Sequence, residues 1–263
     1  MKKTITICFT NNKGGSGKST TCGNIGAAMA RSGHKVLLID GDMQMNLSLS
    51  FFPEDKVLEM SEGKDNLYYA VTGQKDLTSY IVRTPYENLD MIPSSSRMSS
   101  VEAELSRGRN RESVLNRCLS GVKDSGEYDY ILIDAPPTLG NWVMNILCAS
   151  DYVLVPVEAS PWGMFGLANM FDFLNEAKEI SPSLEILGIV VTKADLRKGY
   201  FKQTLETLKE MEGIYLFDSY IRVDSAVEWA QDNSAPVVEY KRSCRSAKEY
   251  IKLAEEVTER AGR

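Results

Sequence analysis

The chain has 263 residues, enough for one α/β domain with a well-covered core, so we expect a single domain over residues 1–263. A net charge of −6 excludes a constitutive DNA-coating protein and leaves room only for a local nucleic-acid patch. Five scattered cysteines without a CxxC pair, and no apolar stretch of membrane-spanning length, predict a protein of the reducing cytoplasm.

Apolar runs of strand length recur along the chain. Because they are uninterrupted rather than alternating, they indicate strands buried on both faces, as in a parallel sheet covered by helices. Helical patterns at 19–32, 164–179 and 200–211 lie between them, which predicts a doubly wound, mostly parallel α/β fold. The predicted strands are Ile5–Phe9, Val36–Ile39, Tyr130–Ile133, Tyr152–Val157 and Ile186–Val191, with a weaker one at Ile214–Phe217.

The segment from about residue 51 to 117 is less regular, and a helix is expected around Val101–Ser106. It is either an ordinary surface crossover or a place for partner contacts. Since the first strand begins within the opening residues, we expect no helix-turn-helix domain before it.

A glycine-rich stretch, TNNKGGSGKSTT at 10–21, follows the first strand and opens the first helix. In that context backbone N–H groups wrap phosphates at a helix N-terminus, with Lys18 at the β- and γ-phosphates and the Ser19 hydroxyl on Mg²⁺. The strict GxxxxGK[ST] pattern fails, because Asn12 stands where its first glycine would be. A plain glycine turn is the alternative. The predicted nucleotide-binding residues are Lys13, Gly14, Gly15, Ser16, Gly17, Lys18, Ser19 and Thr20.

Acidic residues end two of the predicted strands. Asp134 closes YDYILID at the sheet edge where ligands of open α/β sheets bind, so it is the predicted Walker B carboxylate, although it could instead cap the next helix. Asp40 and Asp42 follow Val36–Ile39, and their two-residue spacing on extended chain predicts that both face the phosphates. One would orient the attacking water and the other would support Mg²⁺.

Together these elements resemble the ParA/MinD family of deviant-Walker ATPases, and more closely its ParA (Soj-like) branch. The resemblance spans nearly the whole chain, and the pair of lysines, Lys13 and Lys18, is its most specific feature. The segments that carry it are KGGSGKSTT at 13–21, IDGDMQMN at 39–46, YILIDAPP at 130–137, VPVEASPWGMFGL at 155–167, VVTKADLR at 190–197 and PVVEY from Pro236.

The resemblance implies specific roles. Lys13 corresponds to the signature lysine that reaches the partner's phosphates in an ATP-bound sandwich homodimer, and Asp42 to the switch I aspartate needed for hydrolysis. Asp40 is its structural neighbour. The chain departs from the family's usual DPQGN, since Met43 replaces the proline and Met45 the glycine.

The ParA branch also implies slow, partner-stimulated ATP hydrolysis, non-specific DNA binding over the nucleoid, and a ParB-type DNA-binding partner in plasmid or chromosome partition. The basic patches of both copies in a dimer would together bind the phosphate backbone, independently of the DNA sequence. The candidate DNA contacts are Arg197, Lys198, Arg222, Lys241, Arg242 and Arg245.

Three alternatives stay open. Thr192–Asp195 reads TKAD, a pattern with which some GTPases read guanine, so GTP competes with the favoured ATP. A MinD-like protein would need a basic amphipathic C-terminal helix, but Glu255, Glu256 and Glu259 crowd that helix and make membrane recruitment the weaker hypothesis. A metabolic P-loop enzyme would need an acceptor site or reactive nucleophile, and we find none.

Overall fold

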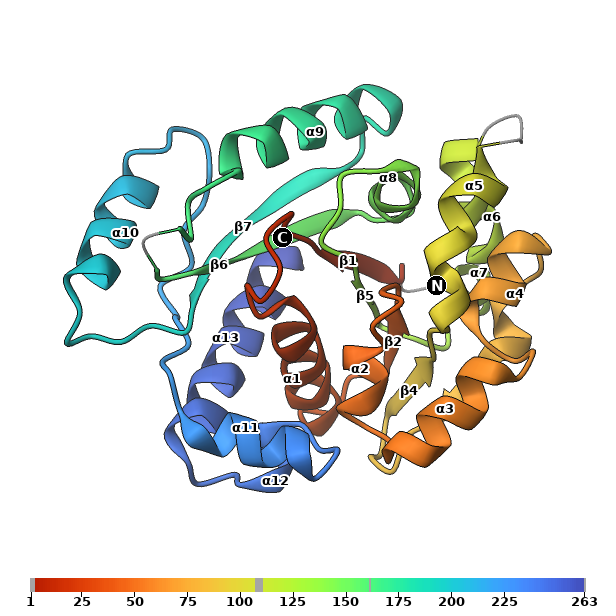
Figure 1. The fold of residues 1–263 in the computed structure, drawn as a ribbon, viewed down its shortest axis with the longest axis horizontal. Coiled ribbons are helices and arrows are strands. Elements are labelled where there is room, and N and C mark those ends of the chain that lie inside the picture. The colour runs from red at the N-terminus through yellow and green to blue at the C-terminus, as the bar shows by residue number, and fades with distance from the viewer. Residues whose placement is uncertain (1–2, 107–110, 161, 263) are drawn as a thin grey trace.

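The computed structural model describes residues 3–106, 111–160 and 162–262. A seven-stranded sheet in the order β3-β4-β2-β5-β1-β6-β7 lies at its centre with helices on both faces, as Figure 1 shows. Neighbouring strands pair in parallel except β3 with β4. The strands are β1 Ile5–Phe9, β2 Val36–Asp40, β3 Val82–Arg83, β4 Leu89–Ile92, β5 Tyr130–Asp134, β6 Tyr152–Glu158 and β7 Glu185–Thr192.

Helices connect and cover the strands. Within the described ranges none is both long and apolar enough to cross a bilayer. The α-helices are α1 Lys18–Arg31, α2 Asn46–Leu49, α3 Glu54–Glu62, α4 Leu67–Thr72, α5 Val101–Leu105, α6 Val114–Cys118, α7 Ser120–Ser125, α8 Asn141–Cys148, α9 Leu167–Ile180, α10 Gly199–Lys209, α11 Ser225–Asp232, α12 Val237–Tyr240 and α13 Arg245–Ala261.

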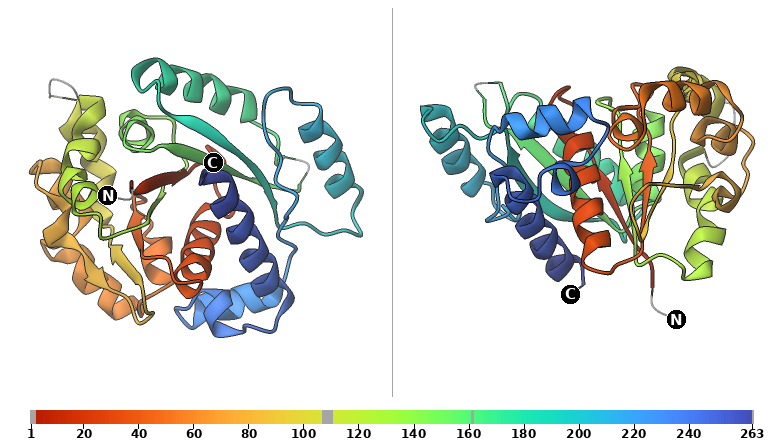
Figure 2. Two further views of the ribbon diagram at one scale, coloured as in Figure 1. Left: turned by 180° about the vertical axis from the view of Figure 1, so that it is seen from behind. Right: turned by 90° about the horizontal axis from the view of Figure 1, so that it is seen from below.

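The core consists of two hydrophobic clusters, one on each face of the sheet. In β5, Ile131 and Ile133 face the cluster that includes α8 and α9, whereas Leu132 faces the cluster that includes α1 and α13. Figure 2 shows these two helical layers from behind and from below. Burial on both faces explains the uninterrupted apolar runs, and the predicted doubly wound, mostly parallel α/β fold is confirmed.

Some element predictions need correction. The weak strand at Ile214–Phe217 is only a bridge at Leu216, because backbone hydrogen bonds join this segment to β7 at Ile189 and not along a ladder. The sequence also missed β3 and β4 in the irregular 51–117 segment. The helix expected at 164–179 begins only at Leu167, because Gly166 takes a left-handed φ of 80° just before it.

The sheet register brings the ends of five strands to one edge of the sheet. Asp134 lies opposite both Phe9 of β1 and Asp40 of β2, and Glu158 of β6 lies opposite Thr192 of β7. Since parallel strands end at one edge of a sheet, the segments that follow β1, β2, β5, β6 and β7 gather there.

Candidate nucleotide-binding site

The glycine-rich loop joins β1 to α1 and leaves the helix start open. Gly15 and Gly17 have φ values of 75° and 85°, in the left-handed region that favours glycine. The N-cap residue Gly17 supplies no side-chain hydrogen bond to the first turn of α1. The first N–H groups of α1 are therefore available to a bound anion, which the helix dipole favours.

A cavity of about 1180 Å³ opens over this loop and is large enough for a nucleotide. Its loop side is formed by Gly14, Gly15 and Gly17 with Lys18, Ser19 and Thr20. Asp42 and Gln44 from the segment after β2 also line it, as do Thr192 and Lys193 at the end of β7 and residues 221–224 before α11. Ser16 of the loop is completely buried, and its hydroxyl has no hydrogen-bond partner in the part of the chain that the structure describes.

Lys18 is buried at the loop side of the cavity, with an exposed fraction of 6%. Its ammonium donates to the carbonyl oxygen of Lys13 at 3.2 Å. Burial lowers the pKa of Lys18, while the carboxylates of Asp134 and Asp42 act in the opposite direction. A desolvated cation held in place by backbone is well suited to a phosphate, because its charge is not dissipated in water.

Asp134 is completely buried at the end of β5, and among the described residues neither carboxylate oxygen finds a hydrogen-bond partner. Burial raises the pKa of Asp134 well above its usual value, and the negative charge of Asp40 adds to this, while Ser19 and Lys18 nearby partly offset it. A buried carboxylate without partners is costly unless a cation joins it. Beside Ser19, it fits a magnesium ion brought in with a nucleotide.

The carboxylates of Asp40, the last residue of β2, and Asp42 do not both face the cavity, which corrects the sequence interpretation. Asp40 is completely buried and accepts hydrogen bonds from Ser48 N at 2.8 Å, Ser48 Oγ at 2.6 Å and Asp42 N at 3.2 Å. Burial raises its pKa to about 6. Only Asp42 lines the cavity. The residues after β2 turn instead of staying extended, and Asp40 anchors that turn, so its predicted magnesium role has no geometric support.

Lys13 lies beside the loop and is bonded to its own chain. Its ammonium is 2.5 Å from Glu158 Oε2 at the end of β6 and 3.0 Å from Ser160 Oγ. Sequence reasoning did not single out Glu158 or Ser160, although both lie in the VPVEASPWGMFGL segment. Pro161 of that segment lies outside the described residues.

The TKAD segment supports the loop instead of presenting its aspartate to a base. The Thr192 hydroxyl donates to the Ser16 carbonyl at 2.8 Å and so braces the glycine loop. Asp195 is not part of the cavity lining and binds the Arg197 guanidinium through two hydrogen bonds of 2.9 Å. The geometry therefore does not favour guanine recognition by Asp195.

Most of the six candidate DNA contacts already have partners within the chain. Arg197 binds Asp195, Arg242 binds Glu239 at 2.6 Å, and Arg222 binds Glu249. Arg245 donates to the Val223 carbonyl at 2.6 Å. Lys241 lies 5.6 Å from the centre of the Trp229 ring, and Lys198 is exposed.

The fold and the site define a class. A glycine loop between a buried strand and a helix, next to a buried aspartate at the end of a parallel strand, is typical of a P-loop NTPase. The sequence profile of the AAA domain family (AAA_31) matches residues 4–186. The chain belongs to the ParA/Soj-like family of P-loop ATPases, as the following relatives show.

Chromosome partitioning protein ParA of Caulobacter vibrioides is 32% identical over 255 residues, which cover 97% of this chain and 94% of the relative. Sporulation initiation inhibitor protein Soj of Bacillus subtilis is 33% identical over 252 residues, which cover 95% of this chain and 97% of that relative. Among solved structures, cobyrinic acid a,c-diamide synthase of Mycobacterium smegmatis with bound ATP analog and magnesium superposes with a TM-score of 0.85. It is 25% identical and the superposition covers 99% of this chain and 97% of that one.

Proposed function

We propose that this chain is a magnesium-dependent ATPase that dimerises on ATP, binds non-specific DNA as the dimer, and partitions a plasmid or chromosome with a ParB-type partner. Membership of the ParA/Soj-like family and the partition roles named for its relatives support this proposal. The observation that carries it is that Lys13, Lys18, Asp42 and Asp134 lie at one sheet edge. Lys18 and Asp42 line the cavity, whereas Lys13 lies outside its lining.

Each residue has a role that follows from its position. Lys18 and the N–H groups at the start of α1 bind the phosphates. Ser19 and Asp134 would hold Mg²⁺, which when bound neutralises charge on the phosphates. Asp42 lines the cavity, and in the described part of the chain its side chain accepts one hydrogen bond, from Gln44 N, so one of its oxygens remains to orient the attacking water.

Lys13 makes dimerisation depend on nucleotide. Within one chain its ammonium pairs with the carboxylate of Glu158. A second cation brought to the transferring phosphates of the partner would act as an arginine finger does. ATP binding would then lead two copies to assemble, and the basic residues of both copies would contact the phosphates of one DNA duplex together.

The test is binding of the purified protein to non-specific duplex DNA at moderate salt, with ATP, ADP or no nucleotide, while the oligomeric state is followed by light scattering. ATP-dependent dimerisation and DNA binding are expected, with both lost in Lys13→Ala and nucleotide binding itself lost in Lys18→Ala. ATP-dependent dimerisation without DNA binding would replace the partition role with positioning of a protein or membrane cargo. Absence of both would point to a metabolic P-loop enzyme.

A further inference from the structure

Residues 222–224 form one wall of the nucleotide cavity, well separated in sequence from the glycine loop. Arg222, Val223 and Asp224 line the cavity together with Ile221 and with Val227 of α11. Three of these five residues are apolar, and the charges of Arg222 and Asp224 are of opposite sign. If the phosphates occupy the loop, the ribose and base extend into the remaining cavity, where apolar side chains and a few polar groups provide binding.

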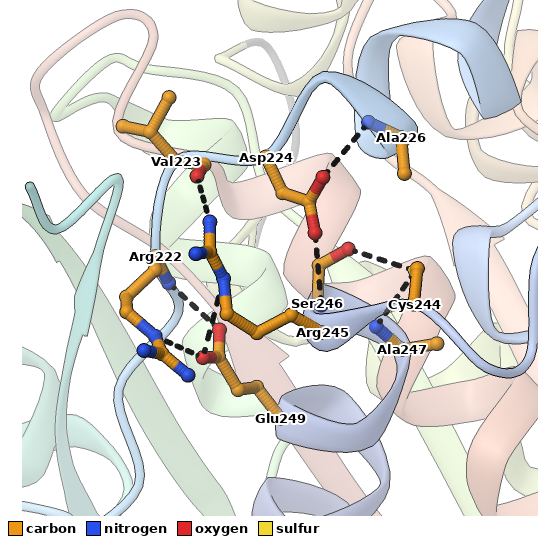
Figure 3. A network of polar contacts seen from close by, with 9 residues as sticks. All are labelled: Arg222, Val223, Asp224, Ala226, Cys244, Arg245, Ser246, Ala247 and Glu249. Carbon is orange, nitrogen blue, oxygen red and sulfur yellow. Dashed lines mark hydrogen bonds and ion pairs between the residues drawn. The ribbon is translucent and has the colours of Figure 1, made fainter.

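Each residue of this 222–224 wall forms a hydrogen bond with a residue of α13, as Figure 3 shows. Glu249 accepts from Arg222 N at 2.9 Å and also from the Arg222 guanidinium. Arg245 donates to the Val223 carbonyl at 2.6 Å, and Asp224 accepts from Ser246 N at 3.1 Å. The hydrogen bonds come from both backbone and side-chain atoms, so they fix the path of the chain as well as the side chains.

Other support for the wall is limited. Val223 N bonds to the Ala194 carbonyl at 3.1 Å, and Arg222 forms an isolated bridge with Ala194. The Val223 side chain itself is 54% exposed and cannot anchor the segment by packing. In contrast, α13 is fixed firmly, because Leu253 and Val257 are completely buried against the sheet. A rigid helix therefore holds a segment that has little packing of its own.

The charged side chain of Glu249 is the centre of this arrangement. Its side chain is 15% exposed and that of Arg222 is 33% exposed, so water only partly screens their interaction. Arg245 lies 4.0 Å from the same carboxylate. Charge-assisted hydrogen bonds in such a setting are stronger than neutral ones, and removing one charge leaves the other unpaired.

We infer that Glu249 and Arg245 are positioning residues for nucleotide recognition: they hold the 222–224 wall and thereby set the affinity for the ribose and base, without contacting the phosphates. This inference rests on the proposed nucleotide-binding function of the same cavity. It also gives Arg222 and Arg245 a role at the nucleotide site, apart from the DNA contacts expected of them.

The experiment compares Glu249→Gln with the wild-type protein. The substitution keeps the side-chain size but turns one acceptor into a donor that faces Arg222. Affinity for MgATP is measured by calorimetry, and inorganic tripolyphosphate is measured as a competitor of a fluorescent ATP analogue. The dissociation constant for MgATP should rise about tenfold, KM for ATP should rise with kcat unchanged, and the tripolyphosphate constant should stay within about twofold.

Two further variants complete the design. Glu255→Gln changes an exposed glutamate of the same helix and should leave all three quantities unchanged. Arg245→Met removes the bond to the Val223 carbonyl and the weaker 4.0 Å ion pair with Glu249, and an MgATP affinity about threefold weaker is expected even if Glu249→Gln proves too unstable to purify. Equal MgATP binding by the wild type, Glu249→Gln and Arg245→Met would overturn the inference. So would a parallel loss of MgATP and tripolyphosphate binding. Failure of the wild-type protein to bind MgATP would instead overturn the proposed function.

Discussion

The ammonium of Lys13 and the carboxylate of Glu158 form an ion pair 2.5 Å long within one chain, although 145 positions separate them. Their side chains are 23% and 25% exposed, so water screens the pair only in part. If Lys13 reaches a second copy, as proposed, it must first leave Glu158. The pair would then oppose dimerisation by the free energy of an ion pair of this kind, about 1 kcal/mol.

Replacing Glu158 with glutamine should make dimerisation easier. The neutral amide binds the Lys13 ammonium less strongly, so the ATP concentration for half-maximal dimerisation should fall roughly fivefold, as about 1 kcal/mol implies. An ATP titration followed by sedimentation measures this. Glu185→Gln, at the exposed start of β7, is the matched control and should have no effect. A midpoint that is unchanged or higher in Glu158→Gln would contradict the proposal for Lys13.

Asp42→Ala should separate binding from hydrolysis. The side chain lines the cavity and, within the described ranges, accepts a single local hydrogen bond, from Gln44 N at 3.0 Å, so its removal should change ATP affinity little. Loss of the group that orients water should lower kcat by about 100-fold or more and trap the ATP-bound dimer. Phosphate release and size-exclusion profiles test both parts. Hydrolysis at the wild-type rate would remove Asp42 from the mechanism.

Gly41→Ala tests the close approach of β2 and β5 below the site. A Cβ at Gly41 would lie 2.6 Å from the Asp134 carbonyl oxygen and 3.1 Å from Ile146 Cδ1, and the carbonyl cannot move aside as a flexible side chain could. The free energy of unfolding should fall by about 2–3 kcal/mol, measured in urea. Gly199→Ala is the control, because no atom lies within 4 Å of its Cβ position. Equal losses in the two variants would show that crowding is not the cause.

Met45 occupies a left-handed conformation with φ 56° and ψ 24° at the start of α2, where the family usually has glycine. A β-branched side chain tolerates this region poorly, so Met45→Val should lower the free energy of unfolding by about 1–2 kcal/mol. Met45→Gly removes the strain but also the partly buried side chain, and should stay near the wild-type value. Thermal melts of the three proteins give the ranking, and a valine variant as stable as the wild type would argue against strain here.

Asp224 gives a pH-dependent prediction. Burial raises its pKa, but hydrogen bonds from Ala226 N and Ser246 N outweigh this, so the pKa lies below the usual 3.8. Its contribution to stability is therefore complete above the unfolded pKa and is lost as pH falls through the lower, folded one. Asp224→Asn keeps an oxygen that can cap α11 but turns the acceptor facing Ser246 N into a donor, so it should cost about 1 kcal/mol at pH 7, and the difference should shrink below about pH 4. A difference that is the same at pH 7 and pH 3 would contradict this.

Much of this protein could be predicted from its sequence because the signals are local. All five strong apolar runs are strands, since burial on both faces of a parallel sheet demands continuous hydrophobicity. The loop around Lys18 was placed correctly between strand and helix for the same reason: glycine geometry and the first helical turn depend on adjacent residues. These local features suffice for the fold and for the phosphate end of the site.

The partners of the charged residues were decided only by the tertiary structure. Sequence spacing predicted that Asp40 and Asp42 both face the phosphates, but the Asp40 carboxylate accepts hydrogen bonds from the backbone and hydroxyl of Ser48 instead. Glu158 pairs with Lys13, and Glu249 with Arg222, across 145 and 27 positions. Such pairs form because sheet register and helix docking bring distant side chains together, and a charge buried by that packing binds whichever opposite charge the fold supplies. No periodic pattern in the sequence predicts these contacts between distant charged residues.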